Sequence, residues 1–166
     1  MFSGFRLMTR PLVVFDVDGV LADVRHRLHH VERRPKDWDA FFDAAPADPP
    51  LATGVALALE SARDGEVVYV TGRPERCRAD TLAWFARQGL PPGELSMRGP
   101  RDRRPARVAK LELLRRLARD RVVAVVVDDD LQVCRAYEQA GFTVLRATWM
   151  GEEPALEQAQ EADGRT

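Results

Sequence analysis

The sequence predicts a doubly wound α/β fold with a parallel sheet of about five strands. Short continuous apolar runs recur along the chain, and such runs are typical of strands that are buried on both faces of a sheet. Segments with apolar residues at helical spacing lie between them, and strands that alternate with helices indicate a parallel sheet. The chain has 166 residues, 45% of them hydrophobic, which is enough for one domain with a core.

The expected strands are four apolar runs rich in β-branched residues and one weaker segment, residues 94–98. In chain order they cover residues 12–15, 67–70, 94–98, 122–127 and 143–145.

Four helices are expected between the strands. Proline is favoured at the first position of a helix and glycine directly after the last, so Pro74 begins the second helix, and Gly89 and Gly141 end the second and the fourth. The other expected helices cover residues 51–63, 108–117 and 131–140.

One domain is expected over residues 11–150. Residues 24–50 separate the first strand from the first core helix and predict a small helical insertion of one or two short helices and a proline-rich turn. This insertion is too short for a large lid domain. Residues 151–166 are polar and are expected to form a frayed tail.

Net charge, apolar runs and cysteine content indicate which partners and which cellular location to expect. The 25 basic and 26 acidic residues leave a net charge of −1, which gives no overall attraction to nucleic acid or an anionic membrane. No apolar run reaches the roughly 18 residues of a membrane span. The two cysteines, Cys77 and Cys134, fall in expected helices, so we expect free thiols and a cytoplasmic location. The segment before Arg10 is too short and mixed for a signal peptide, and Met8 is an alternative start to Met1.

Polar groups follow three of the expected strands. In doubly wound sheets, ligands bind beyond the carboxyl ends of the strands, so these groups are expected to converge on one place. They are Asp16 and Asp18, then Thr71, Gly72 and Arg73, then Asp128, Asp129 and Asp130.

The acidic residues of this group predict a metal site. Asp16, Asp18, Asp128 and Asp129 would place several carboxylates at one point, and their repulsion requires a cation. A hard divalent ion with oxygen ligands, Mg²⁺ above all, meets this need. Asp130 is instead expected to cap the helix that follows it.

The remaining groups predict phosphate binding. Thr71 offers a hydroxyl, and Gly72 at a helix start offers backbone N–H groups. Lys110 is one of only two lysines among the 25 basic residues, which indicates a need for a compact ammonium that arginine does not meet. A metal, an ammonium, a hydroxyl and backbone amides together describe a phosphoryl site.

These residues predict a phosphomonoesterase. Asp16 attacks phosphorus and forms an aspartyl-phosphate. Asp18 protonates the leaving alkoxide and then takes a proton from the attacking water. Mg²⁺ shields Asp16 from the phosphate, and Lys110 and Thr71 hold the phosphoryl oxygens.

In order and spacing, this set resembles the four motifs of haloacid dehalogenase (HAD)-type phosphatases over residues 11–150. The resemblance implies a Rossmann-like sheet with a minimal cap. It also implies that the Asp16 side chain, the Asp18 backbone carbonyl and a carboxylate of the fourth motif, here Asp128, bind Mg²⁺. Val20 stands where the family usually has threonine, at a position that contributes mostly backbone.

A closer likeness is to the phosphatase domain of polynucleotide kinase-phosphatases. It includes residues 16–18, Arg104, Val108 and Lys110, residues 127–129, Gln132 and Val133. Ala106 and Arg107 depart from the pattern, because they replace an acidic pair. No glycine-rich P-loop with lysine is present, so a kinase half is not expected. The likeness implies a 3′-phosphatase that acts on nucleic-acid ends or nucleotides.

Arginines, histidines and aromatic residues near the expected site suggest further roles, most of which have a structural alternative. Arg73, Arg98 and Arg104 are the expected substrate contacts. The basic run Arg98, Arg101, Arg103, Arg104 and Arg107 could follow a nucleic-acid backbone, or it could be a solvated loop of an arginine-rich protein. His26, His29 and His30 have poor spacing for zinc and could line the pocket mouth. Trp38, Phe41 and Phe42 indicate packing of a small helix, with base stacking as the alternative.

Three other functions compete with the nucleic-acid 3′-phosphatase. A 5′-nucleotidase or small-metabolite phosphatase would use the same chemistry. A phospho-receiver signalling domain also uses aspartates, Thr, Lys and Mg²⁺, but its phosphorylated aspartate follows a middle strand, where this chain has Thr71. A catalytically idle binding module would not need the full motif set. The expected partner is a phosphomonoester; the sequence indicates no membrane and no particular protein partner.

Overall fold

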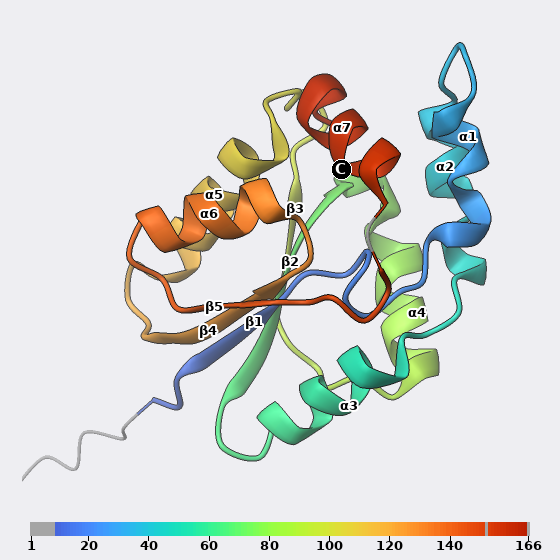
Figure 1. The fold of residues 1–166 in the computed structure, drawn as a ribbon. Helices are drawn as coiled ribbons and strands as arrows, with labels where there is room; N and C mark the ends of the chain where they lie inside the picture. The colour runs from blue at the N-terminus through green and yellow to red at the C-terminus, as the bar shows by residue number, and fades with distance from the viewer. Residues whose placement is uncertain (1–8, 152, 166) are drawn as a thin grey trace, which may run out of the picture.

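In a computed structural model, which describes residues 9–151 and 153–165, the chain forms a five-stranded parallel sheet (Figure 1). The alternative starts at Met1 and Met8 lie outside the described residues. The strands are β1 (Leu12–Phe15), β2 (Glu66–Pro74), β3 (Leu95–Arg98), β4 (Val123–Asp128) and β5 (Val144–Arg146). Their order in the sheet is β3-β2-β1-β4-β5. This confirms the predicted doubly wound fold.

Helices cover both faces of the sheet, as Figure 1 shows. The helices α3 (Ala52–Ser61) and α4 (Arg78–Gln88) pack on the face of Val13 and Phe15. The helices α5 (Ala106–Leu117) and α6 (Leu131–Gln139) pack on the opposite face, over Leu12 and Val14. Because successive strand residues point to opposite faces, β1 needs apolar side chains at every position, and this explains its continuous apolar run.

The expected helix start at Pro74 is wrong. β2 continues through Pro74, a 3₁₀ turn follows at Glu75–Cys77, and α4 then begins at Arg78. Proline fits here because its ring fixes a φ that extended backbone also adopts. Gly89 ends α4 in the left-handed conformation, with a φ of 67°, as expected.

The insertion after β1 is small. It consists of the short helices α1 (His29–Glu32) and α2 (Trp38–Asp43), flanked by 3₁₀ turns at Arg25–Arg27 and Ala45–Ala47. The rings of Trp38, Phe41 and Phe42 contact one another, with centroids 5.4–5.9 Å apart. All three are buried, so they pack the insertion onto the core and present no open ring face for stacking.

The expected frayed tail is also wrong. Residues Pro154–Asp163 form a helix, α7, with Leu156 and Ala159 buried in the core. Two ion pairs attach it, Arg107 to Glu161 at 3.3 Å and Lys36 to Asp163 at 2.8 Å. Figure 1 shows α7 between α5 and the α1–α2 insertion. The apolar residues of this segment are few, but their helical spacing gives α7 one face that packs.

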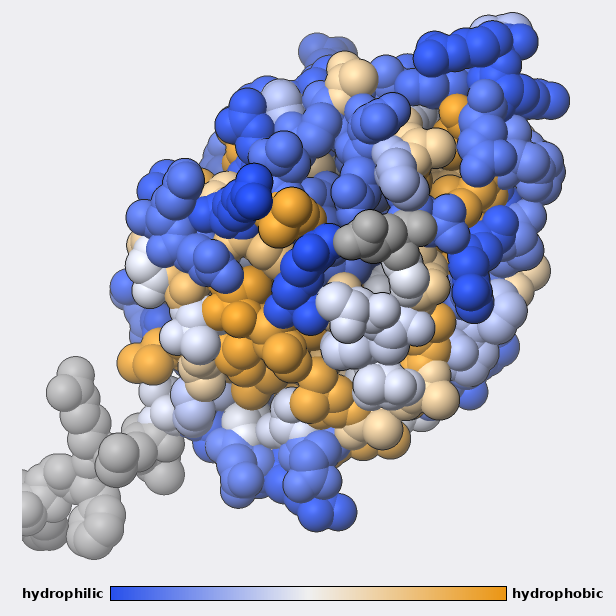
Figure 2. Space-filling view, in the orientation of Figure 1, coloured by the Kyte–Doolittle hydropathy of each residue, from blue (hydrophilic) through white to orange (hydrophobic). Residues whose placement is uncertain are grey.

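The face shown in Figure 2 is mostly polar, with an apolar area where β4, β5 and α3 lie in Figure 1. Leu59 of α3 and Leu145 of β5 are among the exposed large apolar side chains, at 48% and 43%. Across residues 9–151 and 153–165, no helix is long and apolar enough to span a membrane.

Helix α3 packs tightly against the loop that follows β1, and this predicts an intolerant glycine. A Cβ at Gly54 would lie 1.8 Å from the Val20 carbonyl oxygen, which also accepts a hydrogen bond from Trp149 at 2.8 Å. Helix propensity alone favours Gly→Ala by about 1 kcal/mol. We expect the clash to dominate, so that Gly54→Ala lowers the free energy of unfolding by about 2 kcal/mol in urea denaturation.

The control for this prediction is Gly99→Ala. Nothing lies within 4 Å of a Cβ built at Gly99, so its unfolding free energy should change by less than about 0.5 kcal/mol. If Gly54→Ala proves as stable as the wild type, α3 does not hold the loop after β1 in the way described.

Candidate active site

The loop after β1 brings the first acidic motif to the carboxyl edge of the sheet. The Asp16 N–H donates to the Val127 carbonyl of β4 at 2.9 Å, so Asp16 remains tied to the sheet. Gly19 then adopts a left-handed φ of 80°. A Cβ at Gly19 would lie 2.1 Å from a carboxylate oxygen of Asp129. Glycine is therefore needed for the loops after β1 and β4 to approach each other this closely.

Three carboxylates meet at this edge of the sheet. Asp16, Asp128 and Asp129 each offer an oxygen within 4.8 Å of the others. Asp16 is 4% exposed and Asp128 is 1% exposed. The Lys110 ammonium of α5 lies 3.1 Å from Asp16 Oδ2 and 2.9 Å from Asp128 Oδ2. One ammonium thus stands beside three carboxyl groups, which we call the acidic cluster, and it cannot balance their negative charge when all three are ionised.

Burial and mutual repulsion change the pKa values in the acidic cluster. Burial, and then the neighbouring Asp128, raise the pKa of Asp16 to about 8. Burial, and then Asp16, raise the pKa of Asp129 well above its usual value. Burial opposes the charged form of Lys110, but Asp128 and Asp16 raise its pKa well above its usual value. The donor set fits Mg²⁺, which prefers carboxylate oxygens and supplies the missing positive charge.

These shifts predict how stability depends on pH and on Mg²⁺. The pKa of Asp16 is about 8 in the folded chain and 3.8 in its ordinary state, so between pH 3.8 and about pH 8 the folded chain binds more protons than the unfolded chain. The contribution of Asp16 to the free energy of unfolding therefore falls as the pH rises through this range. Mg²⁺ binds the deprotonated carboxylates. We expect Mg²⁺ to raise the melting temperature by several degrees more at about pH 8 than at about pH 5.5.

Thermal denaturation at both pH values, with NaCl at matched ionic strength as the control, measures this difference. A larger Mg²⁺ effect at the acidic pH would contradict the assignment of the acidic cluster as the metal site.

The Asp18 carboxylate lies apart from the acidic cluster. It accepts from Arg73 at 2.6 Å and from Arg27 at 2.9 Å. Both arginines also contact Asp48, Arg27 at 2.8 Å and Arg73 at 3.1 Å. All four side chains are buried, and we call them the Asp18 network. The role of Asp18 as a metal ligand, which the HAD resemblance assigns to its backbone carbonyl, stays a prediction, while its carboxylate is bound to two guanidinium groups.

The Asp18 network also sets the charge of Asp18. Burial alone would raise the pKa of this carboxyl, but Arg73 and then Arg27 lower it to about 2. In this arrangement Asp18 is ionised at neutral pH and can accept a proton. To act as an acid it must first give up these ion pairs and take up a proton from solvent.

The three arginines expected to contact substrate all contact protein groups in the structure. Arg73 is 1% exposed and belongs to the Asp18 network. Arg98 is also 1% exposed; it donates to the Gly72 carbonyl at 3.3 Å and to the Arg104 carbonyl at 2.8 Å. Arg104 is exposed and pairs with two neighbouring carboxylates, both at 2.6 Å. The guanidinium groups of Arg73 and Arg98 are enclosed by protein, and the substrate contacts expected of these arginines stay a prediction.

Thr71 and Gly72 lie at the carboxyl end of β2, on the strand next to β1. Tyr69 of β2 pairs with Phe15, so Thr71 lies two residues further along beside the loop of the first acidic motif. The Thr71 side chain is fully buried, and its Oγ1 accepts the Arg73 N–H at 3.2 Å. Phosphate binding by Thr71 and Gly72 stays a prediction.

Two members of the Asp18 network, Arg27 and Asp48, were not predicted from the sequence. Arg27 stands in a run of basic residues and Asp48 in a proline-rich turn, where charged side chains are usually solvated. Only their joint burial in the fold shows that they pair. By contrast, Asp130 caps α6 as predicted, because its carboxylate accepts the N–H groups of Gln132 and Val133 at 2.8 and 3.2 Å.

The histidines of the insertion do not form a metal site. His26 Nε2 lies 2.6 Å from Asp48, so this ring extends the Asp18 network toward the surface. The rings of His29 and His30 contact each other, with centroids 4.0 Å apart. Within residues 9–151 and 153–165, the one group with metal-ligand spacing consists of the three aspartates of the acidic cluster.

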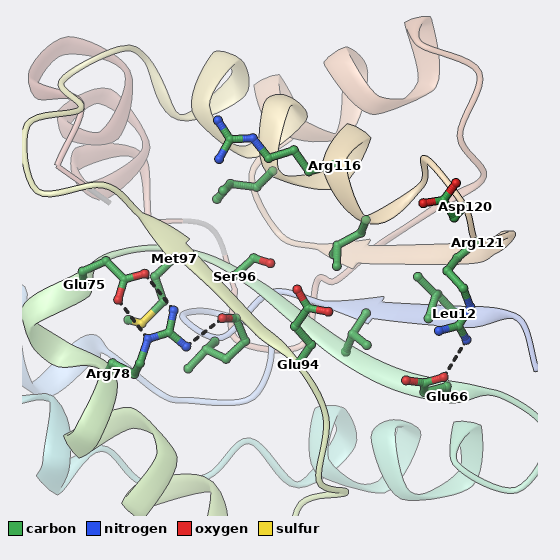
Figure 3. A pocket seen from close by; sticks show the side chains of 14 residues that line it. Leu12, Glu66, Glu75, Arg78, Glu94, Ser96, Met97, Arg116, Asp120 and Arg121 are labelled. Atoms are coloured by element: carbon green, nitrogen blue, oxygen red, sulfur yellow. Dashed lines mark hydrogen bonds and ion pairs between the residues drawn. The ribbon is translucent and has the colours of Figure 1, made fainter.

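A pocket of about 420 Å³ lies elsewhere, between β3 and α5 (Figure 3). Its rim mixes both charges and holds two ion pairs, Arg78 with Glu75 at 2.7 Å and Arg121 with Glu66 at 2.5 Å. None of the residues predicted for the site lines this pocket. We therefore assign the chemistry to the acidic cluster at the carboxyl edge of the sheet.

Comparison with known proteins agrees with this geometry. The family model of the polynucleotide kinase PNKP phosphatase domain matches residues 10–149. A chain of the Pnkp1/Rnl/Hen1 RNA repair complex superimposes with a TM-score of 0.70 at 19% identity, over 88% of this chain and 45% of that chain. A haloacid dehalogenase-like hydrolase from Streptococcus pneumoniae superimposes with a TM-score of 0.56 at 12% identity, over 92% of both chains.

A 2-haloacid dehalogenase from Pseudomonas syringae gives a TM-score of 0.53 at 15% identity, over 87% of this chain and 89% of that one. At these identities the solved structures show the fold alone. No curated protein matches the chain by sequence. The chain spans 45% of the length of the chains of the Pnkp1/Rnl/Hen1 complex that it matches.

Proposed function

The chain belongs to the family of the polynucleotide kinase PNKP phosphatase domain, within the HAD superfamily of phosphatases, and from this premise we propose that it removes 3′-phosphates from nucleic-acid ends. The observation that carries the chemistry is the acidic cluster, in which the Lys110 ammonium lies 3.1 Å from Asp16 and 2.9 Å from Asp128. A carboxylate next to a cationic phosphate site suits nucleophilic attack on a phosphomonoester.

The reaction we propose has two steps, both at phosphorus. In the first, an Asp16 oxygen forms a bond to phosphorus while the ester P–O bond breaks, which leaves an aspartyl-phosphate and an alcohol. In the second, water attacks the aspartyl-phosphate and releases inorganic phosphate. Lys110, Thr71 and the Gly72 backbone hold the phosphoryl oxygens in both steps.

Asp18 moves the protons in these steps. In the first step it gives a proton to the leaving oxygen, and in the second it takes one from the attacking water. Arg73 and Arg27 lower the pKa of Asp18 to about 2, so Asp18 is ionised in this arrangement and is a weak base. Both roles therefore require that its contacts with the arginines are replaced, which raises its pKa. For the first role Asp18 then takes up a proton from solvent and passes it to the leaving oxygen, and in the second step it regains one from the attacking water.

Asp16, Asp128 and Asp129 would hold a divalent cation, and we propose Mg²⁺. When bound, this ion supplies positive charge that reduces the repulsion between Asp16 and the substrate phosphate. Lys110 already offsets part of the negative charge and remains beside Asp16 and Asp128.

The preference for nucleic-acid ends rests on the family and on the small insertion. A short insertion leaves room for a long substrate, and the related Pnkp1 chain belongs to an RNA repair complex. One observation favours a second candidate, a nucleotidase or small-metabolite phosphatase. Asp16 is only 4% exposed and Thr71 is fully buried, so a small ester would reach them more easily.

A substrate panel tests the proposal. It compares an oligonucleotide with a 3′-phosphate, the same oligonucleotide with a 5′-phosphate, the corresponding mononucleotides and sugar phosphates, all with Mg²⁺. We expect kcat/KM for the 3′-phosphorylated oligonucleotide to exceed the others by at least about tenfold, or about 1.4 kcal/mol in transition-state binding. Equal or faster hydrolysis of 5′-nucleotides or sugar phosphates would support the second candidate instead.

A further inference from the structure

An arginine-lined groove lies at the carboxyl ends of β2 and β3. It consists of two hollows of about 650 and 260 Å³ that share Arg103 and Arg165. Its walls are the insertion, the loop after β3 and the end of α7. We propose that this groove binds the phosphate backbone of a single-stranded polynucleotide whose 3′ end enters the active site. This inference rests on the proposed function and names its substrate as a strand rather than a mononucleotide.

The groove carries an excess of positive charge. Its cationic side chains are Arg34, Lys36, Arg76, Arg103 and Arg165, against two acids, Asp39 and Asp163. The chain as a whole has a net charge of −1, so this excess is local. A local cationic surface attracts the phosphates of a nucleic acid even where the overall charge does not.

Three of these arginines are available for phosphates. Lys36 pairs with Asp163 at 2.8 Å and Arg76 with Asp39 at 3.0 Å. In the part of the chain that the structure describes, no carboxylate forms an ion pair with the other three, Arg34, Arg103 and Arg165. Within residues 9–151 and 153–165, the Arg103 side chain donates hydrogen bonds to the backbone carbonyls of Pro100 and Asp102, both at 3.3 Å.

The sequence leaves open whether the arginines between residues 98 and 107 contact a nucleic-acid backbone or are simply solvated, and the structure separates them by their partners. Arg104 pairs with Asp102 and Glu112, and Arg107 pairs with Glu161. Those two arginines are thus neutralised by neighbouring carboxylates, and Arg98 is buried. Arg103 is the member of the run that lines the groove.

Backbone contacts hold the groove next to the predicted phosphate site. Arg98 donates to the Gly72 carbonyl at 3.3 Å and to the Arg104 carbonyl at 2.8 Å, which ties the loop of Arg103 to the end of β2. A Cβ at Gly164 would lie 2.0 Å from the Arg103 carbonyl oxygen. The end of α7 therefore packs directly on this loop and places Arg165 beside Arg103.

The insertion is attached to the same structure. Asp163 at the end of α7 accepts from Lys36 at 2.8 Å and from the Trp38 indole at 3.0 Å. Trp38 and Phe42 line the groove but are only 8% and 4% exposed. The groove therefore offers charge without open aromatic rings, which suits binding to the sugar-phosphate backbone independent of base sequence.

The test compares a 3′-phosphorylated oligonucleotide with the corresponding mononucleoside 3′-phosphate. In the double variant Arg103→Ala/Arg165→Ala, we expect the ratio of kcat/KM for the oligonucleotide to kcat/KM for the mononucleotide to fall about tenfold. The slope of log affinity against log salt should become shallower by about 0.7 for each phosphate that the variant no longer neutralises. Arg119→Ala is the matched control, because Arg119 is exposed and follows α5 at the amino ends of the strands.

A second measurement follows binding of the oligonucleotide to the groove without its hydrolysis. Binding of the same oligonucleotide is followed by fluorescence anisotropy in an Asp16→Asn background, with and without the groove substitutions. Arg103→Lys should retain most of the affinity, since the groove supplies charge, and Arg103→Ala should not. Circular dichroism confirms that the variants are folded.

Each outcome decides one assignment. An unchanged ratio and an unchanged affinity in the double variant overturn the groove and leave the phosphatase function standing. A wild type that cleaves the mononucleotide but neither cleaves nor binds the oligonucleotide overturns both the groove and the nucleic-acid substrate. A lower oligonucleotide affinity in the groove variants, with the Arg119→Ala control unaffected, supports the groove even if the true reaction proves different.

Discussion

Replacement of Asp16 by asparagine is expected to lower kcat by about 10⁴-fold or more without unfolding the chain. Asparagine has the shape of aspartate, but its amide cannot attack phosphorus. The substitution also removes one charge from the acidic cluster, where burial and Asp128 raise the pKa of Asp16 to about 8. The metal-free variant should therefore melt at a higher temperature than the wild type at about pH 8.

Steady-state kinetics with Mg²⁺ on the best substrate of the panel measure the loss, and thermal denaturation measures the gain in stability. Asp120→Asn serves as the control, because Asp120 is exposed and lines the pocket of Figure 3 away from the acidic cluster. Phosphatase activity of Asp16→Asn near that of the wild type would falsify the assignment of Asp16 as the nucleophile.

Replacement of Arg27 by methionine is expected to lower the free energy of unfolding by about 3–5 kcal/mol. Arg27 is fully buried and contacts Asp18 at 2.9 Å and Asp48 at 2.8 Å. Without it, two buried carboxylates share the single guanidinium of Arg73, and one buried charge is left without compensation. Urea denaturation monitored by circular dichroism gives the change in unfolding free energy.

Two variants test this explanation. Arg25→Met removes an exposed arginine two residues away, whose partner is Asp23, and should change the unfolding free energy by less than about 0.5 kcal/mol. The double variant Arg27→Met/Asp48→Asn leaves Asp18 with Arg73 and should recover part of the loss, because the remaining charges balance. If the double variant is less stable than the sum of both single changes, charge imbalance is not the cause.

Much of the site follows from the order of strands and helices. The apolar runs predict parallel strands, and parallel strands bring their carboxyl ends to one edge of the sheet. This is enough to predict that Asp16 and Asp128 meet there, and the structure places them with Asp129 around Lys110. The prediction succeeds because it depends on backbone topology, which the periodic pattern of apolar residues encodes.

The partners of individual side chains do not follow from the sequence. Nothing in the sequence predicts that the Asp18 carboxylate pairs with Arg73, which lies 55 residues away, and with Arg27 of the insertion. Nor does it predict that Arg73 and Arg98 are each only 1% exposed. Such contacts depend on the direction in which each side chain leaves its strand end and on what packs above it.

The sequence was thus enough to predict the doubly wound sheet, the edge at which the chemistry lies and all three aspartates of the acidic cluster, because these depend on chain topology and local pattern. It was not enough to predict that the polar segment after residue 150 forms a packed helix, that Arg27 and Asp48 complete a buried network, or that Arg103 lines a groove. Burial explains this difference. Whether a charged side chain is solvated or paired depends on segments that are distant in the chain and that meet only in the folded state.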